Sequence, residues 1–296
     1  MPNDNLRSYL HLHFIVFIWG FTAVIGALIT LDALPLVWYR MSIGLLIVLL
    51  YVLYKKLPLK VPRRTVFGFL IAGLIIALHW LTFFKAIKVS NVSVTLACLS
   101  TGAFFTSLLE PIFYKRRVIG YEVLFGLFVV AGLYIIFRFQ GDYFYGIVLA
   151  LTSAFLSAVF SIINGKYAVA AKYDPAIISL YEIFGGVFFL SIYLLFTGSF
   201  TGNFFNVSGS DWMWLFILGS FCTAYAFIVS VKVMKHLSPY TVMLTINMEP
   251  IYGIILALIV FNEKEKMDWT FYLGAGIILM TVILNGILKN YTKIKN

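Results

Sequence analysis

Charged side chains are scarce in this chain of 296 residues: 11% are Asp, Glu, Lys or Arg, whereas 62% are hydrophobic. Soluble domains contain about 25% charged and about 45–50% apolar residues. A soluble protein of this length could not hide so much apolar surface from water. The composition therefore excludes an ordinary soluble domain and predicts that hydrocarbon is the solvent for most of the chain.

Cysteine is also rare, and the two present, Cys98 and Cys222, lie in separate apolar runs. Neither has the Cys or His neighbours at the spacing of a zinc site or a disulfide framework. The H-E-x-x-H motif of metalloproteases and the Walker A motif are absent, as are clustered carboxylates for Mg²⁺. We therefore expect no metal, no cofactor and no enzymatic activity. An integral-membrane enzyme or a channel acting on small amphipathic molecules is the alternative interpretation.

The apolar residues form ten runs, separated by short breaks that contain charged residues or Gly, Pro and Asn. A bilayer core about 30 Å thick requires about 20 apolar residues per helix. We predict an all-α membrane protein whose ten transmembrane helices contact the lipid bilayer. The predicted spans are residues 10–29, 34–54, 66–86, 91–114, 119–137, 143–163, 176–196, 212–231, 240–261 and 269–288.

The net charge of +10 is distributed unevenly between the two sides of the predicted membrane. Of the 22 Lys and Arg residues, Arg40 lies within a span, and the other 21 divide into 16 on the side of the termini and five on the opposite side. An excess of Lys and Arg marks the cytoplasmic side of membrane proteins. We expect a multi-pass protein of the inner (plasma) membrane with both termini cytoplasmic. The positive charge then sets topology and does not indicate a nucleic-acid partner.

The second half of the chain repeats the layout of the first when the sequence is shifted by 147 residues. Lys85 then falls on Lys232, and Lys88 falls on Lys235. We predict two repeats of five helices, at residues 1–140 and 141–296. Because five is odd, the second repeat enters the membrane from the opposite side. Inverted repeats of this kind are typical of secondary transporters, whose substrate site lies near the midplane between the repeats.

Two stretches at equivalent places in the repeats carry a family resemblance. The sequence A-I-K-V-S-N-V-S-V-T-L-A-C-L-S-T-G-A-F-F-T-S-L-L, Ala86–Leu109, is similar to the fourth helix of the drug/metabolite transporter superfamily, EamA type. The sequence V-M-K-H-L-S-P-Y-T-V-M-L-T-I-N-M-E-P-I-Y-G-I-I-L-A-L-I-V-F-N-E, Val233–Glu263, resembles the ninth helix. The family pattern in this helix has a central Pro and ends on a Gly-Glu-like pair.

Pro250 and Glu263 match that pattern in the second repeat, whereas the first repeat departs from it, with Ala103 and Arg116 at the two equivalent positions. W-G at residues 19–20 and P-L-V-W-Y-R, ending at Arg40, resemble the first two helices of the family. The resemblance implies ten helices and alternating-access export of small metabolites such as amino acids. It also implies a cavity between helices 1, 3, 4, 6, 8 and 9.

Glu249 is the main candidate for function because it is an ionisable residue inside an apolar run, next to Pro250. Placing an ionised carboxylate near the midplane costs roughly 2.5–3.5 kcal/mol. Keeping a Glu protonated at pH 7 costs roughly 3.7 kcal/mol. The two costs are comparable, so the sequence leaves the charge state open, as a proton-coupled site would require. The alternative is a structural hydrogen bond to a neighbouring helix.

The other candidates are polar or aromatic side chains within predicted spans. Ionisable residues in spans mark functional sites or buried pairs, and small hydroxyl residues also serve helix packing. Asn247 is equivalent to Ser100 after the 147-residue shift. We predict proton-coupling roles for Glu249 or Glu182, structural roles for Pro250, Glu263 and Arg40, and no metal ligands. The predicted contacts of a small-molecule substrate are Trp19, His79, Trp80, Ser100, Thr101, Asn164, Tyr225, Asn247 and Glu249. The sequence leaves a monomer and a homodimer equally open.

Overall fold

The computed structural model describes residues 2–115, 120–139, 141–169, 173–234, 236–237, 242, 245–246 and 248–295, and the regular secondary structure in this part of the chain is helical, without strands. The first half contains α1 (Pro2–Leu28), α2 (Ala33–Tyr54), α3 (Arg63–Val89), α4 (Val92–Leu99), α5 (Gly102–Tyr114) and α6 (Gly120–Phe139). The second half contains η1 (Gly141–Tyr143), α7 (Phe144–Val169), α8 (Pro175–Phe196), α9 (Gly202–Phe205), α10 (Gly209–Gly219), η2 (Ser220–Tyr225), α11 (Ala226–Val233), α13 (Glu249–Phe261), η3 (Asn262–Glu265) and α14 (Trp269–Lys295).

Seven segments in the described part are long and apolar enough to cross a membrane. They are α1, α2, α3, α4 with α5, α7, α8, and α10 through α11. The other three predicted spans coincide with α6, α13 and α14, but the apolar stretches described in α6 and α14, Leu124–Ile136 and Trp269–Thr281, are shorter. The all-helical membrane fold is confirmed, and the count of ten spans stays a prediction.

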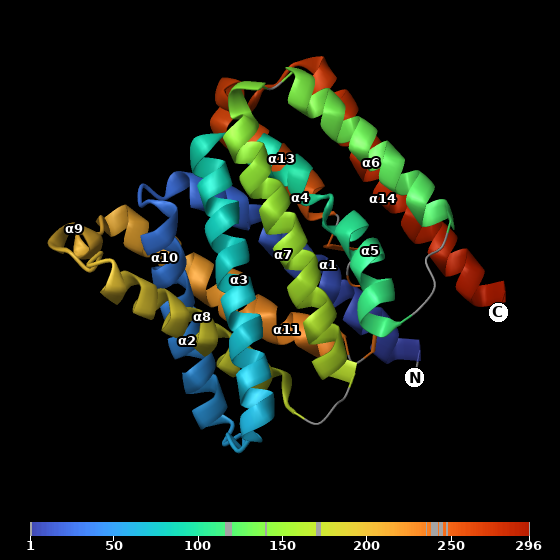
Figure 1. Cartoon of the computed structure of the whole chain (residues 1–296). Coiled ribbons are helices and arrows are strands. Elements are labelled where there is room, and N and C mark those ends of the chain that lie inside the picture. Colours follow the sequence, from blue (N-terminus) through green and yellow to red (C-terminus); the bar gives the residue numbers. More distant parts are fainter. Residues whose placement is uncertain are drawn as a thin grey trace.

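Segments far apart in sequence pack side by side in the bundle. α3 packs against α7 and α8, α1 against α13, and α6 runs alongside α14 at one edge (Figure 1). The contact of α3 with α8 is so close that a Cβ atom on Gly73 would lie 1.9 Å from the carbonyl oxygen of Glu182. Small residues allow such close approach between membrane helices, whose association depends on van der Waals packing.

A helix break occurs at the same place in each repeat. The predicted span 91–114 divides at Ser100 and Thr101 into α4 and α5, and α5 begins at Gly102. In the second repeat α13 begins at Glu249, and 102 plus 147 is 249. Pro250 therefore occupies the first turn of a helix, where its missing N–H is not needed.

The span predicted at 212–231 is also not a regular α-helix. Its central residues, Ser220–Tyr225, form the π-helical segment η2 between α10 and α11. The amide of Ala226 donates to the carbonyl oxygen of Phe221, five residues earlier, and passes over Cys222. Such π segments are rare and frequently lie at functional sites.

Candidate substrate-binding pocket

A cavity of about 90 Å³ lies where the two broken helices meet α1, α2, α3, α7 and α11. It has room for several water molecules. Gly102 at the start of α5 and Glu249 at the start of α13 both line it. The helices that line the cavity correspond to helices 1, 3, 4, 6, 8 and 9 of the family resemblance, and α2 lines it in addition. The structure brings six of the predicted contacts to the wall: Trp19, His79, Trp80, Ser100, Asn164 and Glu249.

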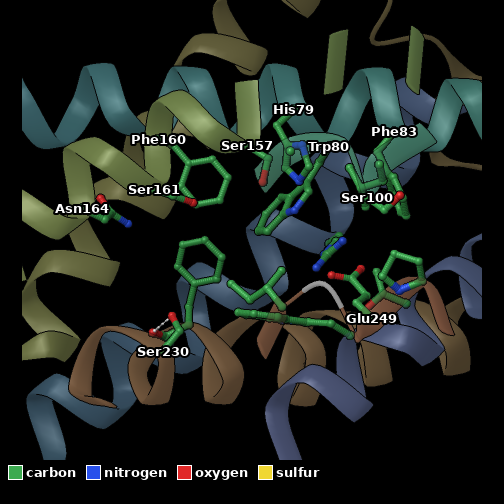
Figure 2. A pocket seen from close by; sticks show the side chains of 18 of the residues that line it. His79, Trp80, Phe83, Ser100, Ser157, Phe160, Ser161, Asn164, Ser230 and Glu249 are labelled. Carbon is green, nitrogen blue, oxygen red and sulfur yellow. Dashed lines mark hydrogen bonds between the residues drawn. The ribbon is translucent and has the colours of Figure 1, made fainter. Parts of the chain in front are cut away.

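The wall combines aromatic rings with scattered polar groups. Figure 2 shows His79 and Trp80 on one side of the pocket, and Ser230 and Glu249 on the other. Glu249 is partly exposed there, whereas Pro250, which follows it, is buried. Apolar surfaces with a few convergent polar groups are typical of small-molecule sites.

Arg40, predicted as a structural residue of α2, also lines this pocket and is 1% exposed. Its Nε donates to Thr223 Oγ1 at 2.7 Å, and its Nη2 donates to the carbonyl oxygen of Cys222 at 3.3 Å. The Trp80 ring lies under the guanidinium, 3.9 Å from its central carbon to the ring centroid. Among the described residues, Arg40 Nη1 has no hydrogen-bond partner. A buried unpaired donor costs about 1–3 kcal/mol, more when it is charged.

The π-helical segment η2 supplies the groups that hold Arg40. Because the Ala226 amide passes over Cys222, the Cys222 carbonyl accepts from Arg40 and also from Trp19 Nε1, at 3.3 Å. The Thr223 hydroxyl that accepts from Arg40 donates to Leu218 at 2.8 Å. A periodic sequence pattern does not distinguish a π turn from an α turn, so this anchor could not be predicted.

His79 is fixed on α3 by Ser153 of α7. His79 Nδ1 lies 2.9 Å from the Ser153 carbonyl oxygen and 2.8 Å from its hydroxyl, which itself donates to the His79 carbonyl at 3.0 Å. In a neutral imidazole these contacts are satisfied when Nδ1 carries the proton, which leaves Nε2 as an acceptor. The ring also contacts Phe83 and Phe160 of the pocket wall. His79 is therefore an oriented acceptor in an aromatic setting.

Glu182 is completely buried and does not line the pocket, but it is connected to it through Asn164. Asn164 Nδ2 donates to Glu182 Oε2 at 3.3 Å. Asn164 Oδ1 and Glu182 Oε1 have no partner in the described part of the chain. The proton-coupling role predicted for Glu182 stays a prediction, and any such role would be indirect, behind Asn164.

Two predicted contacts that the structure describes, Tyr225 and Thr101, do not line the pocket. Tyr225 is 38% exposed and packs edge-on against Phe14, because the extra residue in the π turn shifts the register of the helix. Thr101 is fully buried, and its hydroxyl donates to the Cys98 carbonyl at 2.7 Å. Asn247 lies outside the described residues.

Glu263, predicted as structural, is 80% exposed and pairs with Lys266 at the surface. The buried contact belongs to Glu265 instead, which is 4% exposed. Its two carboxylate oxygens each accept, at 2.9 Å, from the amides of Val92 and Ser93 at the start of α4. A carboxylate at a helix N-terminus satisfies free N–H groups and complements the helix dipole. These residues are more than 170 positions apart, so sequence spacing gave no signal for the contact.

The helical bundle, and a pocket lined by residues from both halves of the chain, indicate a multi-pass membrane protein with a small-molecule site. A model of the EamA-like transporter family matches residues 7–138 and again residues 144–287. The chain belongs to this family, whose members are transporters. A comparison with curated proteins finds no match. Among solved structures, one protein known from a crystal structure aligns with a TM-score of 0.66 and 15% identity, over 95% of this chain and 97% of that one. That likeness shows a shared fold.

Proposed function

We propose that this protein is a secondary transporter that exports small metabolites, such as amino acids, by alternating access. The observation that carries the proposal is the pocket at which both broken helices begin, since it takes polar and aromatic groups from both repeats. Discontinuous helices that end at a site between repeats are typical of secondary transporters. Family membership supports the same class.

In this mechanism the cargo lies between the aromatic side of the pocket and Glu249. Trp80 supplies a flat apolar surface, and His79 and Ser100 supply polar contacts. The repeats then rock about the cargo, so that the pocket opens first to the cytoplasm and then to the outside. Glu249 is the preferred proton-coupling residue over Glu182, because Glu249 itself lines the pocket.

The proposed location is the inner membrane, with both termini in the cytoplasm. The excess of Lys and Arg on the side of the termini supports this orientation. The two ends of the chain and the turn between α2 and α3 also lie toward the same end of the bundle, the lower part of Figure 1. That turn contains Lys55, Lys56 and Lys60.

The test is efflux from proteoliposomes that hold the full chain and a mixed pool of amino acids and other metabolites, read by mass spectrometry with and without a pH gradient. We expect selective loss of one class of compound, and a change in its rate with the gradient if transport is coupled to protons. Folded protein that releases nothing selectively contradicts the proposal. Chemical conversion of a pool member would instead support the alternative, a membrane enzyme, and unselective leakage would support a channel.

A further inference from the structure

One cation in the pocket is held in place but incompletely paired. The Arg40 guanidinium is fixed through Nε and Nη2, and one of its faces is covered by Trp80. Nη1 carries two N–H groups, is buried, and has no partner among the residues that the structure describes. Buried polar groups without a hydrogen-bond partner are uncommon. One that lies on a pocket wall indicates that a ligand supplies the missing partner.

Glu249 lines the same pocket, but the ion pairs within 4.0 Å in the described part of the chain do not include one between Glu249 and Arg40. The pocket therefore presents a guanidinium and a carboxyl group that are not paired with each other. A bound molecule can contact each of them without first breaking a salt bridge.

The surroundings of Arg40 also favour an anion. α5 begins at Gly102 on the pocket wall, and the N-terminus of a helix carries partial positive charge. A Cβ atom on Gly102 would meet its nearest neighbour, the carbonyl oxygen of Ala154, at 3.5 Å, an ordinary van der Waals distance. Phe83, Phe160 and Phe227 complete an apolar wall beside the charged groups.

We propose that Arg40 Nη1 binds the carboxylate of the cargo, and that the apolar part of the cargo lies against Trp80 and the neighbouring phenylalanines. This inference rests on the proposed function, since it assigns the cargo class of the same pocket. Guanidinium is suited to the role because it is planar, stays charged and donates several hydrogen bonds to a planar oxyanion. The π segment gives Arg40 its orientation before the cargo arrives.

The test compares two molecules of the same shape, phenylacetate and phenylacetamide, as ligands of the full chain purified in detergent, with binding followed by thermal stabilisation. We expect phenylacetate to bind roughly tenfold more tightly than phenylacetamide, because Arg40 discriminates the charge. Arg40→Gln should bring the ratio to about one, chiefly by weakening the binding of phenylacetate. Arg64→Gln, an exposed arginine at the start of α3, is the matched control and should keep the preference.

A second variant covers the case in which Arg40→Gln does not fold. Thr223→Val keeps the arginine but removes the hydroxyl that holds Nε, so the preference for phenylacetate should fall several-fold. Equal binding of the two ligands by the unmodified protein overturns the inference. A preference that survives in Arg40→Gln, or in Thr223→Val where Arg40→Gln is unfolded, also overturns it.

The efflux measurement separates this inference from the proposed function. Selective efflux without an Arg40-dependent preference for the carboxylate would overturn the carboxylate site and leave the transporter in place. An Arg40-dependent preference in a protein that moves none of the pool would overturn the transport proposal and support the binding site.

Discussion

The two repeats share a helix break but differ in the chemistry placed there. In the first repeat the break has Ser100 and Thr101, whose hydroxyls donate to the carbonyls of Ala97 and Cys98 in their own helix. In the second repeat it has the carboxylate of Glu249, on the pocket wall. The duplicated backbone interrupts the helical hydrogen bonding at two equivalent places, and only the second repeat has an ionisable side chain there.

The repeats differ in their third helix as well. α3 is a regular helix that carries His79 and Trp80, whereas its counterpart contains the π segment η2. η2 in the second repeat holds Arg40 of the first. The position of the Arg40 guanidinium in the pocket therefore depends on hydrogen bonds between the repeats. The pocket owes its polar groups to the places where the two repeats differ.

The largest effect is expected from Glu249→Gln, which replaces the ionisable carboxyl group at the second helix break with an uncharged amide. We expect transport to fall roughly tenfold or more, or to lose its dependence on pH between about 5.5 and 8, with folding intact, because the variant cannot exchange a proton. Initial efflux rates in proteoliposomes across that range measure this.

Glu182→Gln is the matched control, since Glu182 is buried and does not line the pocket. It should keep the pH dependence of the unmodified protein. If Glu182→Gln loses that dependence while Glu249→Gln keeps it, the proton-coupling role belongs to Glu182.

A second comparison contrasts a packing glycine with a pocket glycine. Gly73→Ala places a Cβ atom 1.9 Å from the Glu182 carbonyl oxygen, a backbone atom that cannot move aside alone. We expect it to lower the free energy of unfolding by about 1–3 kcal/mol or more. Gly102→Ala meets its nearest neighbour at an ordinary 3.5 Å and should be neutral or stabilising by about 0.5–1 kcal/mol. Unfolding in detergent measures both, and equal losses would contradict the close packing assigned to Gly73.

The smallest predicted difference concerns two acids at the end of the second repeat. Glu265→Gln weakens the bonds to the amides of Val92 and Ser93 and should destabilise the protein by about 1–2 kcal/mol. Glu263→Gln alters an exposed pair with Lys266 and should change stability by less than about 0.5 kcal/mol. Thermal unfolding compares them. A larger loss for Glu263→Gln would mean that the predicted structural role was assigned to the right residue after all.

The sequence predicted the features that depend on local pattern. Long apolar runs gave the helical membrane fold, and the isolated polar residues Trp19, His79 and Glu249 lie on the pocket wall as expected. The features that it missed depend on contacts between distant segments. Tyr225 lies in the π turn and outside the pocket, and the same turn holds Arg40. Neither feature changes the hydrophobic periodicity of the sequence.

The central claim, that this pocket opens alternately to both sides of the membrane, is tested most directly by thiol accessibility. Ser161, which lines the pocket, is replaced by Cys in a chain carrying Cys98→Ala and Cys222→Ala, and a charged, membrane-impermeant maleimide is applied to inside-out and right-side-out vesicles. Ser179→Cys in the same background is the control, because Ser179 is fully buried and does not line the pocket. Our account predicts labelling at position 161 from both sides and at position 179 from neither. Labelling at 161 from one side alone, or no more than at 179, would contradict it.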